Sequence, residues 1–133
     1  MDVQELACDF AILYGTDFQW NQANIYSVPH ATGVYALYSR RGALVYVGRA
    51  GPGRLQSRLL EHWREHRFRQ IESFHWFQCA RSRDSESLES LLILDFQPRW
   101  NVQKKGMPLI VADNEGRVLD QFFMPRGPIT ICY

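Results

Sequence analysis

The sequence predicts a small α+β domain, and three observations lead to this class. Two segments rich in Val and Tyr flank the turn residues Arg40-Arg41-Gly42, as the strands of a hairpin do. Two later segments carry apolar residues at helical spacing. An aromatic-rich segment of strand character lies between those two helices. The strands are expected at residues 33–38, 43–48 and 72–80, and the helices at 53–68 and 85–96.

The first predicted helix is amphipathic and follows the chain break at Gly51-Pro52-Gly53. Its apolar residues recur at i, i+4 and i+8, at Leu55, Leu59 and Trp63. Arg54, Arg58 and His62 keep the same spacing on an adjacent stripe. The second helix is expected to stop before Pro98.

The two ends of the chain carry weaker patterns. Residues 4–13 are predicted to form a short helix, and residues 17–25 a turn anchored by Trp20. The C-terminal tail predicts a second hairpin over residues 108–123, which turns at residues 113–116.

No repeat, low-complexity segment or long linker divides the chain, so a single domain, 1–133, is expected. Within it we expect an N-terminal extension, 1–30, and a C-terminal hairpin extension, 106–133.

Composition excludes several classes of protein. Hydrophobic residues make up 46%, which allows a core and argues against global disorder. No apolar run reaches the roughly 18 residues that a membrane-spanning helix needs, so no membrane partner is expected. The first 13 residues carry three acids and no Lys or Arg, unlike a signal peptide. The three cysteines are far apart and predict neither disulfides nor a metal motif, which favours a cytoplasmic location.

Charge is distributed unevenly along the chain. The net charge is +1, yet residues 40–83 contain ten arginines against the three acids Glu61, Glu65 and Glu72. This local excess of arginine fits either a phosphate-binding surface or a solvated helix face.

Four side chains suggest phosphate chemistry. A hairpin would bring Tyr35 close to Tyr46, and a phenol with its ordinary pKa of about 10 is a poor base unless its surroundings help it. Arg58 could bind a phosphate through its planar fork, and His62 could carry a proton near neutral pH. The plainer alternative is two aromatic residues in a sheet beside the polar shoulder of an amphipathic helix.

Glu89 is the unusual residue of the second helix. Leu92, Ile93 and Phe96 fall beside it on the face that should be buried. A carboxylate in an apolar stripe is costly unless it is paired or binds a metal. The alternative interpretation places Glu89 at the rim, paired with an arginine.

Taken in order along the chain, these elements resemble the GIY-YIG nuclease family. The matching elements are Gly33-Val34-Tyr35, Tyr46-Val47-Gly48-Arg49, Arg58 with His62, and the run from Glu89 to Gln97-Pro98-Arg99-Trp100-Asn101. The closest likeness in motif is to the N-terminal nuclease module of the bacterial nucleotide-excision-repair endonuclease. It covers residues 31–105, the expected nuclease core.

The resemblance implies a three-stranded antiparallel sheet flanked by helices, and cleavage of a DNA phosphodiester with one Mg²⁺ or Mn²⁺ ion. By position, Glu89 is the metal ligand and Arg58 contacts the scissile phosphate. Tyr35 and Tyr46 position or activate the attacking water, and one of them is the general base. His62 stands where the family often has His or Tyr, and Asn101 would hold the loop after the metal helix. Gly33 and Gly48 complete the structural motif.

The chain departs from the family pattern in several places. Val34 and Val47 replace the isoleucines of the family name, and Arg49, still able to bind phosphate, replaces a commoner Lys or small residue. The Gly51-Pro52-Gly53 segment lengthens the path to Arg58, so Arg54 competes for the role of catalytic arginine. Arg58 is preferred because His62 follows it by one helical turn.

Two rival functions belong to other classes. His62-Trp63-Arg64-Glu65-His66 matches an inverted zinc-peptidase pattern, which needs both histidines on one helix face and a third ligand such as Glu86 or Glu89. A binding module of the same fold without activity is the second rival. Repair, restriction and recombination roles all stay open. The near-neutral net charge is compatible with specificity supplied by a second subunit or a partner protein.

Overall fold

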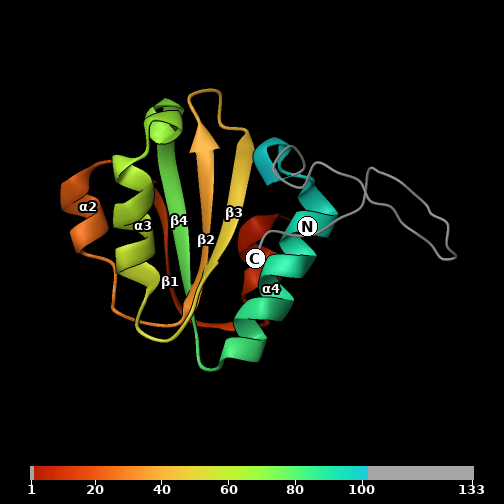
Figure 1. The fold of residues 1–133 in the computed structure, drawn as a ribbon. Coiled ribbons are helices and arrows are strands. Elements are labelled where there is room, and N and C mark those ends of the chain that lie inside the picture. Colours follow the sequence, from red (N-terminus) through yellow and green to blue (C-terminus); the bar gives the residue numbers. More distant parts are fainter. Residues whose placement is uncertain (1, 102–133) are drawn as a thin grey trace, which may run out of the picture. The chain divides into compact units, whose positions relative to one another are not determined.

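The computed structural model describes residues 2–101 of the chain (Figure 1). Its contacts divide the chain into two units, Met1–Glu89 and Ser90–Tyr133. The elements are α1 Val3–Ala7, β1 Ala11–Gln19, α2 Gln22–Tyr26, β2 Gly33–Ser39, β3 Leu44–Ala50, α3 Leu55–Arg64, the 3₁₀ helix η1 His66–Gln70, β4 Ile71–Cys79 and α4 Ser82–Phe96. The predicted hairpin over 108–123 lies outside the described residues.

The first unit contains a four-stranded sheet in the order β1-β4-β2-β3, and every neighbouring pair is antiparallel. The predicted α+β class is confirmed, but the prediction of three strands is wrong. The fourth strand is β1, which lies in the segment predicted to be an N-terminal extension. The predicted helix over 4–13 ends at Ala7, and most of the predicted turn over 17–25 is divided between β1 and α2.

The sequence pattern does not predict β1, because this strand depends on pairing with a distant segment. Its apolar residues Ile12, Leu13 and Tyr14 are exposed, so no alternation of buried and polar residues marks the strand. The strand exists because it pairs with β4, nearly 60 residues later, through a register that shifts twice. Asp17 takes a left-handed backbone conformation with φ 59° between two of the paired segments.

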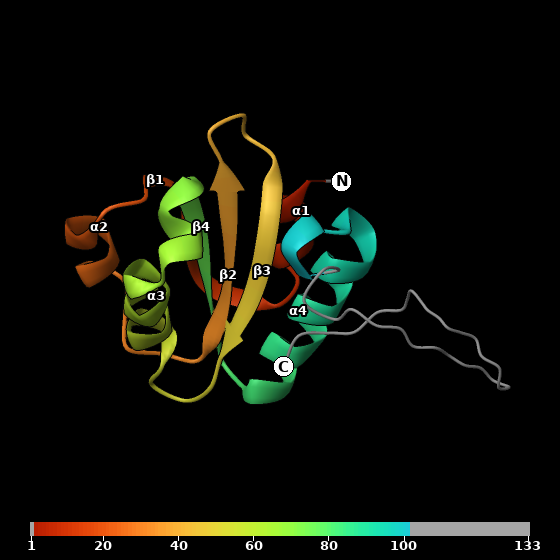
Figure 2. The ribbon, with the colours of Figure 1, turned by 45° about the horizontal axis from the view of Figure 1, so that its top comes forward.

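The core lies around β2, the inner strand that carries the first Gly–Tyr motif. Residues 33–37 of β2 are all buried, as expected for a strand covered on both faces. Both ribbon views show α2 and α3 side by side on one face of this sheet (Figures 1 and 2). Gln56 of α3 joins the two helices, because its Nε2 donates to the carbonyl oxygens of Tyr26 and Val28 at 3.1 and 2.8 Å.

Helix α3 confirms the predicted apolar face but is shorter than predicted. Leu55 and Leu59 are buried, and the Trp63 ring lies 5.8 Å from that of Trp20. The helix ends at Arg64, because Glu65 adopts an extended conformation (φ −84°, ψ 133°), and η1 follows. The predicted helix over 53–68 is therefore two elements.

Helix α4 begins three residues before its predicted start and ends at the predicted Phe96. Gln97 ends it with a positive φ of 48°, and Pro98 follows, which cannot continue a helix. Among the described helices, none is long and apolar enough to cross a membrane.

Candidate active site

The β2–β3 hairpin brings the two tyrosines together, as the sequence predicted. Tyr35 pairs with Gly48 across the hairpin and Tyr46 pairs with Leu37, so both tyrosines point to the same face of the sheet. Their ring centroids are 6.3 Å apart. Both side chains are buried. We call Tyr35, Tyr46 and His62 the tyrosine–histidine cluster.

The two motif glycines are required by close approaches rather than by turns. A Cβ on Gly48 would lie 2.4 Å from the hydroxyl oxygen of Tyr35, so glycine lets that ring lie across the neighbouring strand. A Cβ on Gly33 would lie 2.2 Å from the Phe77 carbonyl oxygen on β4. Glycine at these positions therefore sets both the sheet spacing and the position of the Tyr35 hydroxyl.

Substitution of Gly48 by alanine is expected to destabilise the domain by about 1–3 kcal/mol, the usual cost of overpacking a core. The new methyl group would displace the Tyr35 ring. Urea denaturation of both proteins would measure the change in the free energy of unfolding. Gly51→Ala is the matched control, since a Cβ there meets no atom within 4 Å. Equal stability of Gly48→Ala and Gly51→Ala would contradict the close approach.

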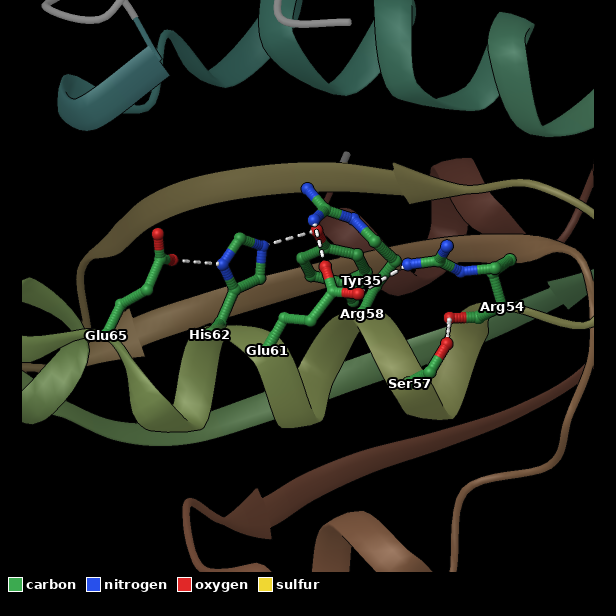
Figure 3. Close-up of polar contacts among 7 residues, drawn as sticks. All are labelled: Tyr35, Arg54, Ser57, Arg58, Glu61, His62 and Glu65. Atoms are coloured by element: carbon green, nitrogen blue, oxygen red, sulfur yellow. Dashed lines mark hydrogen bonds and ion pairs between the residues drawn. The ribbon is translucent and has the colours of Figure 1, made fainter.

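His62 connects a tyrosine to a carboxylate (Figure 3). Its Nε2 lies 2.6 Å from the Tyr35 hydroxyl oxygen, and its Nδ1 lies 2.7 Å from Oε1 of Glu65. The His62 side chain is 3% exposed, and this burial lowers its pKa from 6.5 to about 4. The charges of Arg58 and Arg67 also lower the pKa, whereas Glu65 raises it. At neutral pH the ring is therefore uncharged.

The hydrogen-bond partners assign the tautomer of His62. An ionised carboxylate only accepts hydrogen bonds, so the Nδ1 beside Glu65 must carry the proton. Nε2 then holds a lone pair and accepts the hydrogen bond that the Tyr35 hydroxyl donates. Glu65 was not predicted as a partner of His62, although the spacing of three residues is compatible with contact on a helix.

Burial of a neutral histidine predicts an acid-sensitive stability. Between pH 6.5 and about 4 the unfolded chain binds a proton at His62 that the folded chain does not. The contribution of the neutral ring to the free energy of unfolding is complete above about pH 6.5. It is lost as the pH falls towards 4, a decrease of about 3 kcal/mol in all. We expect His62→Gln to flatten the slope of unfolding free energy against pH in this window.

Chemical denaturation at a series of pH values measures that slope. His66→Gln is the control, because His66 is an exposed histidine on η1. An unchanged slope in His62→Gln, with the folded structure intact, would contradict the neutral buried ring.

Arg58 and Arg54 share one carboxylate but differ in their surroundings. Nη1 of Arg58 donates to Oε1 of Glu61 at 2.6 Å, and Nη2 of Arg54 donates to Oε2 at 2.5 Å. The Arg58 side chain is 33% exposed, against 50% for Arg54. Burial lowers the pKa of Arg58, but Tyr35, Glu61 and Tyr46 raise it and the net shift is upward. Arg58 is thus the arginine coupled to both tyrosines.

Glu89 forms a pair with Arg49, the residue that follows the second Gly–Tyr motif. The Arg49 Nε lies 3.8 Å from Oε1 of Glu89, and its Nη2 lies 3.8 Å from Oε2 of Glu86. The Glu89 side chain is 1% exposed, whereas that of Glu86 is 59% exposed. The predicted burial of Glu89 is confirmed, and so is the arginine partner of the alternative interpretation, although Glu89 does not lie at a rim.

The carboxylate of Glu89 is the type of ligand that a hard divalent cation prefers. Within residues 2–101, no group of three or more His, Cys, Asp or Glu side chains is placed to hold a metal ion. A site at Glu89 would therefore use few protein ligands and leave several positions to water. Mg²⁺ accepts such a site because it prefers oxygen ligands and keeps several waters, whereas a structural zinc site is closed by four protein ligands.

The structure removes the basis of the zinc-peptidase pattern. That pattern needs His62 and His66 on one helix face, but α3 ends at Arg64 and His66 begins η1. Nδ1 of His62 is also engaged by Glu65.

Asn101 belongs to the second unit, where its side chain is buried and its N–H donates to the Pro98 carbonyl at 3.1 Å. Arg67 was not predicted as a site residue, yet its guanidinium carbon lies 5.8 Å from the Tyr46 ring centroid and 4.6 Å from that of Phe68. No sequence spacing pointed to it, since η1 was predicted as part of α3.

The fold of the described residues is similar to that of solved GIY-YIG nuclease domains. The chain resembles the GIY-YIG N-terminal endonuclease domain of UvrC from Thermotoga maritima, solved with its catalytic divalent cation, magnesium. The identity is 25% and the TM-score 0.52, over 62% of this chain and 100% of that domain. A tyrosine-to-phenylalanine mutant of that domain matches at 27% identity and a TM-score of 0.53, over 60% and 92%. No protein-family model and no curated protein sequence matches the chain.

Proposed function

We propose that the chain is a divalent-metal-dependent DNA endonuclease that hydrolyses a phosphodiester bond. The likeness to a GIY-YIG nuclease domain supports a metal-dependent endonuclease in general. The observation that carries the finer proposal is the 2.6 Å contact between Tyr35 and a neutral His62, beside an arginine coupled to both tyrosines. Phosphodiester hydrolysis needs a base for the attacking water and positive charge on the phosphate oxygens, and these side chains supply both.

In this proposal Tyr35 is the general base and His62 is the acceptor behind it. As the water oxygen bonds to phosphorus, its proton passes to the Tyr35 oxygen, and the Tyr35 hydroxyl proton passes to Nε2 of His62. The bond from phosphorus to the leaving oxygen breaks with its electron pair on that oxygen, which takes a proton from solvent. The imidazolium then releases its proton to solvent, which restores both side chains.

Arg58 is proposed to contact the scissile phosphate. Its guanidinium stays charged, and its fork can donate two parallel hydrogen bonds to phosphate oxygens. Glu61 accepts a hydrogen bond from the Arg58 guanidinium at 2.6 Å. This contact limits the motion of the Arg58 side chain before substrate binds. Tyr46, whose ring centroid is 5.5 Å from that of His62, is proposed to position the water.

Glu89 is proposed to hold one Mg²⁺ or Mn²⁺ ion. Such an ion would lower the pKa of bound water and stabilise charge on the phosphate. Arg49, beside Glu89, and Arg54, at the start of α3, are proposed to bind neighbouring DNA phosphates. Asn101 is proposed to support the loop after α4.

We assign this function to residues 31–105 of a single domain, 1–133. Specificity is proposed to come from a second subunit or a partner protein.

Nicking of supercoiled plasmid and of branched DNA in Mg²⁺ or Mn²⁺ tests the function. The expected result is open-circular plasmid that fails to form when EDTA is present. One site cuts one strand, so linear product would require a dimer or two encounters. Absence of cleavage on both substrates would overturn the proposal, and DNA binding without cleavage would identify the inactive binding module instead.

A further inference from the structure

We propose that Glu65 is a positioning residue of this site. Its carboxylate holds the Nδ1–H of His62, so that Nε2 faces Tyr35 and receives the phenol proton. This inference rests on the proposed function, and it gives Tyr35 a histidine that can accept its hydroxyl proton.

Two contacts fix Glu65 against His62. The Glu65 side chain accepts from Nδ1 at 2.7 Å, while its backbone N–H donates to the His62 carbonyl oxygen at 3.0 Å. Its own carbonyl accepts from the N–H of Phe68 at 3.1 Å, which ties it to η1. The extended backbone at Glu65 ends α3 and turns the side chain back towards the histidine (Figure 3).

The chemistry of the two rings explains why a carboxylate is needed. In the other tautomer, Nδ1 would present a lone pair to the carboxylate, and Nε2–H would face the Tyr35 hydroxyl, which could then pass it no proton. With Nδ1–H held by Glu65, only Nε2 can receive a proton. The resulting imidazolium carries a positive charge next to a carboxylate 2.7 Å away.

The other charges around His62 make this carboxylate more important. Arg58 on α3 and Arg67 on η1 both oppose protonation of the ring. Glu61 on α3 acts in the opposite direction, but it is engaged by Arg54 and Arg58. Tyr35 on β2 and Tyr46 on β3 face the ring as phenols. Glu65 forms the hydrogen bond to the ring at Nδ1, and its own side chain is 49% exposed.

Glu65→Gln tests the inference, with Glu72→Gln as the matched control. Glu72 is a comparably exposed carboxylate, 51%, that lies near Arg40. We expect Glu65→Gln to lower kcat roughly 10- to 100-fold with KM unchanged, a part of the 10²–10⁴ that general acid–base catalysis contributes. Glu65→Asp, which keeps the charge, should retain more activity than Glu65→Gln. Wild-type kcat in Glu65→Gln would overturn the inference.

Nitrogen-15 NMR of the histidine side chains gives a readout that needs no cleavage. The wild-type His62 signal should report the Nδ1–H tautomer, and Glu65→Gln should shift it towards a mixture. A wild-type Nε2–H tautomer, or an unchanged tautomer in Glu65→Gln, overturns the inference. If the wild-type protein cleaves no DNA, the proposed function and the catalytic role of Glu65 fall together, whereas the tautomer is still read independently.

Discussion

Glu89→Gln is expected to reduce kcat for DNA cleavage in Mg²⁺ by about 10³-fold or more. The carboxylate is the proposed protein ligand of the metal, and a metal contributes several kcal/mol to stabilising the charge of the transition state. At about 1.4 kcal/mol for each tenfold change in rate, a loss of about 4 kcal/mol gives this factor. Plasmid nicking under single-turnover conditions measures the rate. Titration of Mn²⁺ binding by electron paramagnetic resonance measures metal affinity separately.

Glu86→Gln is the matched control for this experiment. Glu86 lies on the same helix at the same 3.8 Å from Arg49, but its side chain is 59% exposed. Its substitution should leave metal binding nearly unchanged. Cleavage by Glu89→Gln at a rate close to that of the wild type would remove Glu89 from the metal site, and a larger loss in Glu86→Gln would transfer the role to that residue.

Arg58→Ala is expected to lower kcat/KM by about 10²–10³-fold, the usual cost of one donor to a developing oxyanion. Tyr35 and Tyr46 raise the pKa of Arg58, so its charge interacts with the tyrosine–histidine cluster. Arg58→Lys should restore only part of the loss, because an ammonium lacks the planar fork. Cleavage assays over a range of DNA concentrations separate kcat from KM.

Arg54→Ala decides between the two arginines. Arg54 binds the same Glu61 but is half exposed at the start of α3. We therefore expect a small effect, mostly on KM and sensitive to salt, as for a peripheral phosphate contact. A greater loss of kcat in Arg54→Ala than in Arg58→Ala would reverse the assignment of these roles.

Local patterns predicted the parts of the site that lie close together in sequence. The hairpin was readable because Gly, Val and Tyr flank a short turn, and strand alternation then places Tyr35 and Tyr46 on one face. Arg58 and His62 were readable as neighbours because they are one helical turn apart. The burial of Glu89 followed from the helical period, since its neighbours at i+3 and i+4 are apolar.

The end of α3 could not be read in the same way. The helical pattern of residues 53–68 continues past Arg64, yet the chain turns there because Phe68 enters the core and packs its ring 4.3 Å from that of His62. This turn brings the Glu65 side chain to Nδ1 and removes His66 from the helix. A helical period alone would have kept both histidines on one face, as the zinc-peptidase pattern requires.

Residue type and spacing thus predicted the α+β class and the tyrosine hairpin, and they nominated Arg58, His62 and Glu89 as candidate site residues, because each depends on contacts within a few residues. Contacts between distant segments decided the rest. Pairing with β4 made a strand of β1, which has no buried alternation of its own. Burial beside Phe68 keeps His62 neutral, and the hydrogen bond across 27 residues to Tyr35 joins two motifs that are separate in the sequence. Burial and hydrogen-bond geometry are properties of the folded chain, and no local pattern encodes them.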